Sequence, residues 1–511
     1  MPAIKEDFYT GFHTFEKLSD TVGLPVDQTN FVLSQFTALF FAGILRVFLK
    51  PGLVAPATRH LFGLVIGLLL GYFCFGKQAA HLAGLPALCF IAMRTQDPRC
   101  VQRVVLTLAL GYLSCVHYYR QIYAYGSYTL DITGPLMVIT QKVIGLAYNI
   151  HDGFSRLEKD LTPLQRHQAV KIMPTTLEYF SYIFHFQALM AGPVIFYRDY
   201  IDFIHGTKLK GAKSFSGFYD DSSKEPEEIV LEPSPTKAVI KKITASLTLA
   251  VLFVSFSSLY PIQRVKEQDF LDNTTSAYKI WYLMNSMIFV RCKYYYAWLF
   301  ADAICNNSGM GYNGRDENGK DRWDLISNVD PIKFELSLSL KDAISAWNIG
   351  TNRWLRMIVY DRNGPFKVFA TNGLSAFWHG FYPGYYLTFA TGALFTHAAR
   401  AVRRAIRPYF IGSKPMKFFY DAMTFTASRI AMAYLTFSFV LLEFMPSFNV
   451  YKSLYLIPHL LALAAIFILP LLPVRRPSQN GHVKPSYNGY VNYITDRQPE
   501  VRNGTSKNKT E

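Results

Sequence analysis

Charged residues are scarce in this sequence, which excludes an ordinary soluble domain. Only 17% of its 511 residues are charged and 50% are hydrophobic, whereas soluble domains carry about 25% charged residues. Long apolar windows recur along most of the chain and indicate a polytopic membrane protein. The N-terminus is polar and lacks the apolar core of a signal peptide, so insertion would depend on internal spans.

The sequence also lacks the motifs of several enzyme classes. It has 6 cysteines but no CxxC pair or other metal-ligand spacing, so neither a zinc cluster nor a disulfide framework is indicated. HExxH and GxSxG do not occur, and the glycine-rich stretch at 306–330 contains no GK[ST] after a strand. We therefore expect no metal and no flavin or nicotinamide cofactor.

Tryptophan is rare beside the other aromatic residues, with 6 Trp against 41 Phe and 33 Tyr. This composition suits a tunnel or groove lined with rings as well as aromatic belts at the membrane interfaces. Counting alone does not distinguish these two uses.

Basic residues outnumber acidic ones, and the net charge is +16. In a membrane protein, basic loops on the cytosolic side and contact with anionic headgroups explain such an excess. Attraction of a polyanionic substrate, such as a nucleotide-bearing thioester, is a second explanation. Nucleic-acid binding is not indicated, because no basic motif or recognised fold accompanies the charge.

The apolar windows define one membrane domain over residues 31–473. A polar segment, 1–30, precedes it, and a polar tail, 474–511, which we expect to be disordered, follows it. A hydrophilic insert at 204–237 is expected to form an exposed loop. Polar residues interrupt the apolar run at 131–152, which favours a helix facing the protein interior.

One imidazole, His379, lies in an apolar run at 374–399 that is long enough for a membrane-spanning helix. Ionisable groups are costly there and indicate function by default. Helical spacing places Tyr382, Pro383 and Tyr386 on its face. Pro383 predicts a kink that leaves the His379 carbonyl without its helical partner. A second interpretation, in which His379 only packs against a neighbouring helix, stays open on the residues alone.

Further residues are candidates for chemistry or binding. His185 lies in another aromatic run, where helix packing is the simpler interpretation. Arg291 and Lys293 stand in RCKYYYAW, where they could bind a phosphate or extend to the membrane interface. Asn348 lies in an amphipathic segment that is too polar to face lipid. A histidine can take a proton from an alcohol, and an amide can orient the attacking group or donate to an oxyanion.

Four motifs resemble those of a known enzyme family. WHGFYPGYYLTF at 378–389 resembles the signature of the membrane-bound O-acyltransferase family, specifically of its lysophospholipid acyltransferases. RCKYYYAW at 291–298 is similar to a second motif of that branch, and RWD at 322–324 and WN at 347–348 are similar to its acidic and asparagine motifs. The resemblance covers nearly the whole chain and is greatest to the lysophosphatidylethanolamine and lysophosphatidylserine acyltransferases.

The resemblance implies an all-α polytopic membrane fold with roughly 11 transmembrane helices and interfacial or re-entrant helices around an intramembrane tunnel. It implies His379 as the catalytic base and Asn348 as its partner. Acyl-CoA would enter from the cytosolic side, the lysophospholipid would enter from the bilayer, and the free hydroxyl, usually at sn-2, would be acylated directly. The residues expected to bind substrate are Arg291, Lys293, Tyr294, Trp298, Trp347, Trp378, Tyr382, Pro383, Tyr385 and Tyr386.

Several assignments stay open at this point. The acceptor could be lysophosphatidylethanolamine, lysophosphatidylserine or lysophosphatidylcholine, or within the same family a sterol, diacylglycerol or a protein. A lipid transporter or scramblase could use the same tunnel without chemistry. The expected compartment is the endoplasmic reticulum membrane, no cofactor beyond the co-substrate acyl-CoA is expected, and the sequence does not indicate an oligomeric state.

Overall fold

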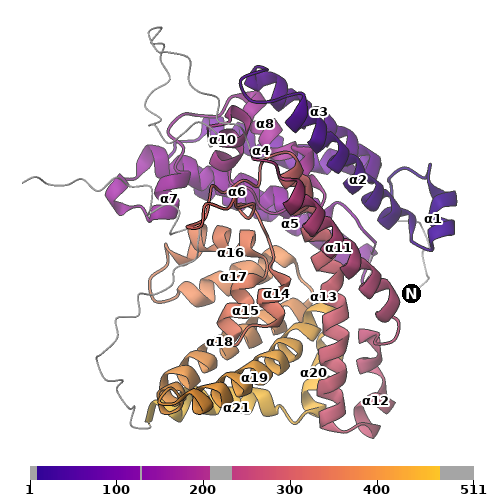
Figure 1. The fold of residues 1–511 in the computed structure, drawn as a ribbon, viewed down its shortest axis with the longest axis vertical. Coiled ribbons are helices and arrows are strands. Elements are labelled where there is room, and N and C mark those ends of the chain that lie inside the picture. Colours follow the sequence, from indigo (N-terminus) through magenta and orange to yellow (C-terminus); the bar gives the residue numbers. More distant parts are fainter. Residues whose placement is uncertain (1–8, 127–128, 208–232, 472–511) are drawn as a thin grey trace, which may run out of the picture.

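The computed structural model describes residues 9–126, 129–207 and 233–471, and every regular element within these ranges is a helix. Figure 1 shows α2 to α10 gathered in the upper part of the molecule and α14 to α21 in the lower part, with α11 and α13 along one side. The predicted all-α class is confirmed. The tail from 472 onward and most of the predicted loop at 204–237 lie outside the described residues.

The upper part begins with α2 already at Val26, inside the segment that we predicted to be the polar N-terminus. Thr162 and Gln165 form a capping box at the start of α7, which makes Pro163 the first helical residue, as helix-start chemistry predicts. The elements are α1 (Glu16–Val22), α2 (Val26–Val47), α3 (Pro56–Phe75), η1 (Gly76–Gln78), α4 (Ala79–Thr95), α5 (Val101–Tyr123), α6 (Thr133–Ser155), η2 (Glu158–Asp160), α7 (Pro163–Gln168), α8 (Thr176–Phe184), α9 (Phe186–Leu189) and α10 (Tyr197–His205).

The second part contains the longest helix, α13, and several short ones. The amphipathic segment at 333–360 forms short helical pieces, and α18 continues through the basic stretch after residue 400 to Phe410. The elements are α11 (Thr236–Phe256), η3 (Ile262–Lys266), α12 (Gln268–Asn273), α13 (Ser276–Asn307), α14 (Pro331–Glu335), α15 (Leu340–Ala346), α16 (Ile349–Leu355), η4 (Arg356–Tyr360), α17 (Lys367–His379), α18 (Pro383–Phe410), α19 (Lys414–Leu441), α20 (Phe444–Ser453), α21 (Ile457–Phe467) and η5 (Leu469–Leu471).

The polar helix α6 lies in the protein interior, as its sequence predicts. Gln141, Lys142, Asn149 and Asp152 are each about 1% exposed. The Asp152 carboxylate forms a bidentate ion pair with Arg362 at 2.5 and 2.9 Å. Gln141, Lys142 and Asp152 are tolerated there because each has a partner on another element of the same protein, whereas the buried Asn149 side-chain amide has no hydrogen-bond partner among the described residues.

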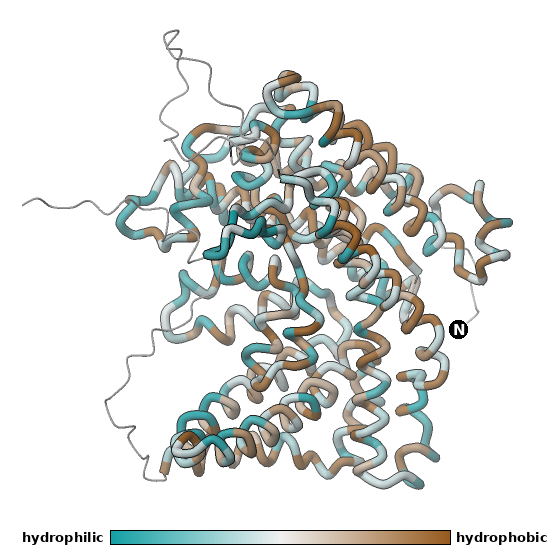
Figure 2. The backbone as a smooth tube through the Cα atoms, in the orientation of Figure 1, coloured by the Kyte–Doolittle hydropathy of each residue, from teal (hydrophilic) through white to brown (hydrophobic). Residues whose placement is uncertain are grey.

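Among the described residues, four helices are long and apolar enough to cross a membrane, or five if the pair bent by 77° near the C-terminus counts as one span. The four are Val26–Val47, Pro56–Thr95, Thr236–Phe256 and Lys414–Leu441. Figure 2 shows hydrophobic residues concentrated along α3 and α11. Fewer helices qualify by length and composition than the roughly 11 spans expected. One reason is that helices such as α6 and α13 carry buried polar and charged side chains.

Candidate active site

His379 is the last residue of α17, whereas the sequence predicted it within a continuous span. Gly380 follows with a positive φ, and Pro383 is the first residue of α18. The predicted helix over 374–399 is therefore wrong, because two helices meet at 380–382. Pro383 causes no kink, since a proline at the first helical position replaces an N–H that has no helical partner. We therefore expect Pro383→Ala to change turnover only slightly.

The chain turns at Gly380 in a conformation that other residues rarely adopt. Its φ is 110° and its ψ is −163°, a region essentially restricted to glycine. A Cβ atom at this position would lie 3.0 Å from Cγ and Nδ1 of His117 on α5. Backbone geometry and the close approach of α5 thus both require glycine, and together they determine where α17 ends.

Gly380→Ala should lower kcat at least tenfold, because it combines roughly 1–3 kcal/mol of backbone strain with a contact against His117 beside the His379 backbone. Gly373→Ala is the matched control, since Gly373 lies on the same helix with open space around it, where alanine stabilises a helix by about 1 kcal/mol. Steady-state kinetics and thermal unfolding of both variants are the measurement. Wild-type kcat in Gly380→Ala would show that this turn does not determine the position of His379.

Aromatic rings from three helices surround the His379 imidazole. Its ring centroid lies 4.5 Å from that of Trp378, 5.4 Å from Phe389, 5.6 Å from Tyr385 and 4.9 Å from Phe439 of α19. The imidazole is half-buried and forms no hydrogen bond or ion pair with any residue that the structure describes. Neither of its nitrogens therefore has a hydrogen-bond partner among the described residues.

The helix break changes which tyrosines reach His379. Tyr385 contacts the imidazole, whereas Tyr386 is 40% exposed, so the predicted shared helical face is wrong for Tyr386. Tyr382 packs against Tyr385 at 5.8 Å, and its hydroxyl accepts a hydrogen bond from the Gly126 N–H at 3.3 Å. With Trp378, three of the predicted binding residues thus belong to the surroundings of the histidine.

Asn348 begins α16 in a left-handed conformation, with φ 46° and ψ 52°, which asparagine tolerates better than most residues. Asparagine is a preferred N-cap, yet the Asn348 side chain makes no capping hydrogen bond. The first N–H groups of α16 bind Asn328 instead: Ile349 donates to its carbonyl at 2.7 Å and Gly350 to its Oδ1 at 3.0 Å. Because Asn328 caps α16, the Asn348 amide does not serve as its cap.

The loop that carries Asn328 is fixed to two long helices. Lys242 of α11 donates to the Asp302 carboxylate of α13 at 2.7 Å and to the Trp323 carbonyl at 2.8 Å. Ser327 donates to the same carboxylate at 2.6 Å. A charge-assisted network of this kind restricts the loop, and through the loop it holds the start of α16.

The acidic residue of the RWD motif, Asp324, stabilises the same loop. It accepts hydrogen bonds from Asn313 at 2.7 Å and from Arg322 at 2.9 Å. Burial by itself would raise the pKa of Asp324, but these hydrogen bonds, with the charges of Arg322 and Lys242, hold the pKa below its ordinary value. The carboxylate is therefore ionised at neutral pH and joins the two arms of the loop.

Three predicted binding residues form one aromatic cluster beside Asn348. The Trp347 ring lies 6.0 Å from Tyr294 and 5.0 Å from Trp298, both on α13, and 5.3 Å from Phe334 of α14. The structure thus brings Tyr294, Trp298 and Trp347 together, although they are far apart in the sequence.

Arg291, predicted to contact phosphate, is bound by a protein carboxylate. Its guanidinium makes two hydrogen bonds to Glu335, at 2.7 and 2.8 Å. Tyr295 donates to the same carboxylate at 2.8 Å, and Arg429 of α19 lies 3.3 Å from it. In this arrangement Arg291 ties α13 to α14 and α19; its contact with a phosphate stays a prediction.

Lys293 differs from Arg291, although only two positions separate them on α13. Its side chain is half-buried and forms no hydrogen bond or ion pair with the residues that the structure describes. The phosphate contact predicted for this residue also stays a prediction, and the surroundings favour Lys293 over Arg291 for it.

His185, the competing histidine, has a packing role in the structure. It is fully buried between α8 and α9, where its Nε2 lies 3.0 Å from the Lys142 ammonium and its ring stacks on Tyr200 at 5.0 Å. Lys142 also donates to the carbonyls of Tyr182 and Ile183 at the end of α8. The predicted aromatic span is therefore a pair of short helices, broken at His185.

One group of side chains within the described ranges could hold a metal ion. Ligand atoms of His60, Glu178 and His205 lie within 4.8 Å of one another. The Nδ1 atom of His60 is already bonded to Ser181 at 2.7 Å, and the neighbouring residue, Arg59, is a cation that opposes a metal ion. The expected absence of a metal stays a prediction.

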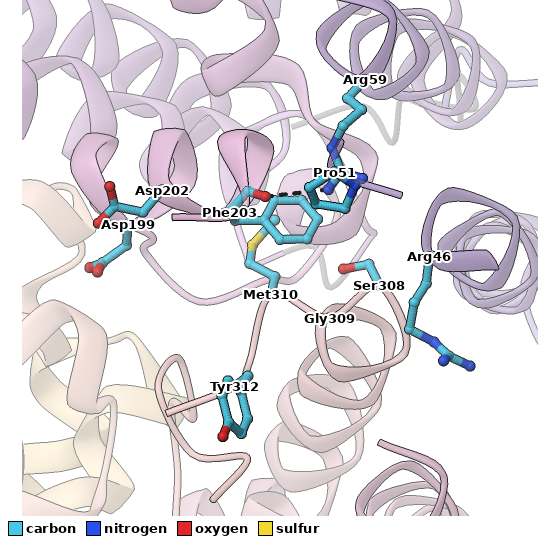
Figure 3. A pocket seen from close by; sticks show the side chains of 11 residues that line it. Arg46, Pro51, Arg59, Asp199, Asp202, Phe203, Ser308, Gly309, Met310 and Tyr312 are labelled. Carbon is cyan, nitrogen blue, oxygen red and sulfur yellow. Dashed lines mark hydrogen bonds between the residues drawn. The ribbon is translucent and has the colours of Figure 1, made fainter. Parts of the chain in front are cut away.

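A pocket lies between α3, α10 and the segment after α13 (Figure 3). Arg59 donates to the Phe203 carbonyl there at 3.3 Å, and Asp199 and Asp202 lie on the opposite side (Figure 3). Neither His379 nor Asn348 lines this pocket. It is therefore separate from the candidate active site.

Comparison with known proteins identifies the family. Residues 117–437 match the sequence profile of the MBOAT, membrane-bound O-acyltransferase family. The chain belongs to this family. Among similar proteins is lysophospholipid acyltransferase 6 of Drosophila melanogaster, 52% identical over 492 residues, which are 95% of this chain and 68% of that protein. Membrane-bound glycerophospholipid O-acyltransferase 1 of Homo sapiens is 37% identical over 98% of this chain and 97% of its own length.

A fungal protein is also similar to this chain over most of its length. The lysophospholipid acyltransferase of Schizosaccharomyces pombe is 32% identical over 93% of this chain and 92% of its own length. The family match includes both predicted catalytic residues and both helices that meet at Gly380. This member of the membrane-bound O-acyltransferase family is a multi-pass, all-α membrane protein.

Sequence reasoning missed the residues that hold the candidate pair and Arg291 in place. His117 contacts the end of α17, Asn328 caps α16, and Glu335 binds Arg291. Each acts from a distant part of the chain, and none stands in a motif. A polar residue inside an apolar run was a usable signal only for His117, which lies in the run that became α5.

Proposed function

We propose that the protein is a lysophospholipid O-acyltransferase that moves a fatty acyl group from acyl-CoA to the free hydroxyl, usually at sn-2, of a lysophospholipid. The observation that carries the proposal is the His379 imidazole, half-buried among aromatic rings and not bonded to a described residue, in a member of the O-acyltransferase family. The names of the relatives support the lipid acceptor.

The proposed mechanism is direct transfer, with His379 as general base. Its imidazole takes the hydroxyl proton while the alcohol oxygen forms a bond to the thioester carbonyl carbon. The C–S bond then breaks, and the thiolate of CoA takes the proton back from the imidazolium, which gives free CoA and a diacyl phospholipid. Asn348 orients the attacking group or donates to the developing oxyanion. No cysteine is needed as a nucleophile.

The proposed site also accounts for the aromatic residues. Rings around His379 exclude water, which protects the thioester from hydrolysis. The cluster of Tyr294, Trp298 and Trp347 lies beside Asn348 and is proposed to contact substrate, as are Trp378, Tyr382 and Tyr385. We further propose the endoplasmic reticulum membrane as the compartment, on the family resemblance alone.

The test is an activity matrix with purified protein in lipid nanodiscs. Lysophosphatidylethanolamine, lysophosphatidylserine and lysophosphatidylcholine are each combined with acyl-CoAs of different length, with His379→Ala as blank. Acceptor-dependent release of CoA with matching diacyl product supports the proposal. Lipid movement without CoA release would make the protein a transporter or scramblase, and transfer only to a sterol, diacylglycerol or peptide would reassign the acceptor.

Lys293→Met should raise KM for an anionic substrate at least tenfold with kcat nearly unchanged, because a hydrogen bond to a charged group contributes roughly 1.5–3 kcal/mol. Arg291→Met should instead lower the free energy of unfolding by about 2 kcal/mol, since it leaves the Glu335 carboxylate with one cation fewer. KM and thermal unfolding of both variants separate the two roles. An unchanged KM in Lys293→Met contradicts the binding role.

A further inference from the structure

The residue before His379 is held by hydrogen bonds to two other helices. The Nε2–H of His117, on α5, donates to the Trp378 carbonyl at 3.0 Å. The indole N–H of Trp378 donates to the carbonyl of Met137, on α6, at 3.0 Å. His117 and Trp378 are both buried, at 7% and 5% exposure, so water does not replace these bonds easily.

A partner for the Trp378 carbonyl is needed because of where α17 ends. The last four carbonyls of a helix have no partner within it, and Trp378 is the penultimate residue of α17. An unpaired buried carbonyl costs roughly 1–3 kcal/mol. The helix end can therefore remain buried at this place only while another group donates to it.

His117 also fits the turn that follows. A Cβ atom at position 380 would lie 3.0 Å from two atoms of the His117 ring, so the imidazole packs directly on the Gly380 backbone. The ring thus contacts both neighbours of His379, Trp378 through a hydrogen bond and Gly380 through van der Waals contact. These contacts leave the position of the His379 backbone little freedom.

We propose that His117 is a positioning residue for His379, acting through the Trp378 carbonyl and the Gly380 turn. The proposal rests on the proposed function, because it concerns how the base is placed for proton transfer. The essential property of His117 is a hydrogen-bond donor at the Nε2 position. The effect on kcat is expected to exceed the effect on KM, because His117 bonds only the backbone carbonyl of Trp378, whereas the predicted binding cluster of Tyr294, Trp298 and Trp347 lies on α13 and just after α15.

Two substitutions separate the donor from the volume of the ring. His117→Leu keeps a buried apolar side chain and removes the donor, whereas His117→Gln supplies an amide N–H. We expect kcat to fall at least tenfold in His117→Leu with KM within twofold of wild type, and to recover to within threefold of wild type in His117→Gln. Leu113→Ala, one turn earlier on α5 and 1% exposed, controls for loss of packing and should keep kcat per folded molecule.

The experiment is acyl-CoA turnover per folded protein in nanodiscs, with the folded fraction measured by size exclusion. Wild-type kcat in His117→Leu, or equal losses in the Leu and Gln variants, would overturn the positioning role. If His117→Leu does not fold, His117→Met takes its place in the comparison. Activity that persists in His379→Ala would overturn the proposed function instead, whatever the His117 variants show.

Discussion

His379→Ala should reduce acyl transfer from oleoyl-CoA to a lysophospholipid by about 10²–10⁴-fold, the usual contribution of a general base. The imidazole has no hydrogen bond or ion pair to a described residue, so its removal leaves no buried polar partner behind. Thermal stability should therefore change only through the lost ring contacts. The measurement is initial rate in nanodiscs, normalised to folded protein.

His397→Ala is the matched control for this prediction. His397 lies on α18 of the same region and stacks on Phe369, at a centroid distance of 6.2 Å, outside the rings around His379. Its alanine variant should keep most of the activity. Turnover retained in His379→Ala, with the protein correctly inserted, would remove the histidine from the proposed mechanism.

Asn348→Gly should lower kcat by about 10²–10³-fold, the range found when one donor to an oxyanion is deleted. Glycine adopts the left-handed conformation of this position without strain, and Asn328 still caps α16. The substitution therefore removes the amide and keeps the backbone. The measurement is kcat per folded molecule with saturating acyl-CoA and lysophospholipid.

Asn348→Ala separates loss of the amide from backbone strain. Alanine in the left-handed conformation costs roughly 1–2 kcal/mol, so this variant should unfold at a lower temperature than Asn348→Gly and show the same kcat once folded. A kcat near wild type in Asn348→Gly would mean that the amide takes no part in the chemistry.

The sequence allowed prediction of those parts that depend on local composition. Polar residues within an apolar run placed α6 in the interior. The WHG and WN motifs identified His379 and Asn348 as candidates. Each of these signals lies within a few residues of the feature that it predicts.

The end of α17 could not be predicted in the same way. Proline is the obvious helix breaker in the run, and the sequence predicts a kink at Pro383 within one continuous helix. Gly380 causes the break, because α5 brings His117 to within 3.0 Å of any Cβ there. Such a constraint comes from a helix more than 200 residues away. The local sequence around the glycine therefore does not reveal it.

Charge pairing was hidden for the same reason. Arg291 stands among tyrosines that invite an anionic ligand, but Glu335 reaches it from α14. The pair is 44 positions apart, beyond any helical spacing, so the two candidate cations of RCKYYYAW looked equivalent. Only the folded arrangement distinguishes Arg291 from Lys293.

The helix end at His379 has an electrostatic consequence. The aligned peptide dipoles of a helix place a partial negative charge at its C-terminus, which stabilises a nearby cation by roughly 0.3–2 kcal/mol. His379 is the last residue of α17, so the imidazolium formed during proton abstraction would arise at this negative end. A continuous helix through the same residues would have cancelled this field. The break therefore contributes one interaction that favours the protonated base.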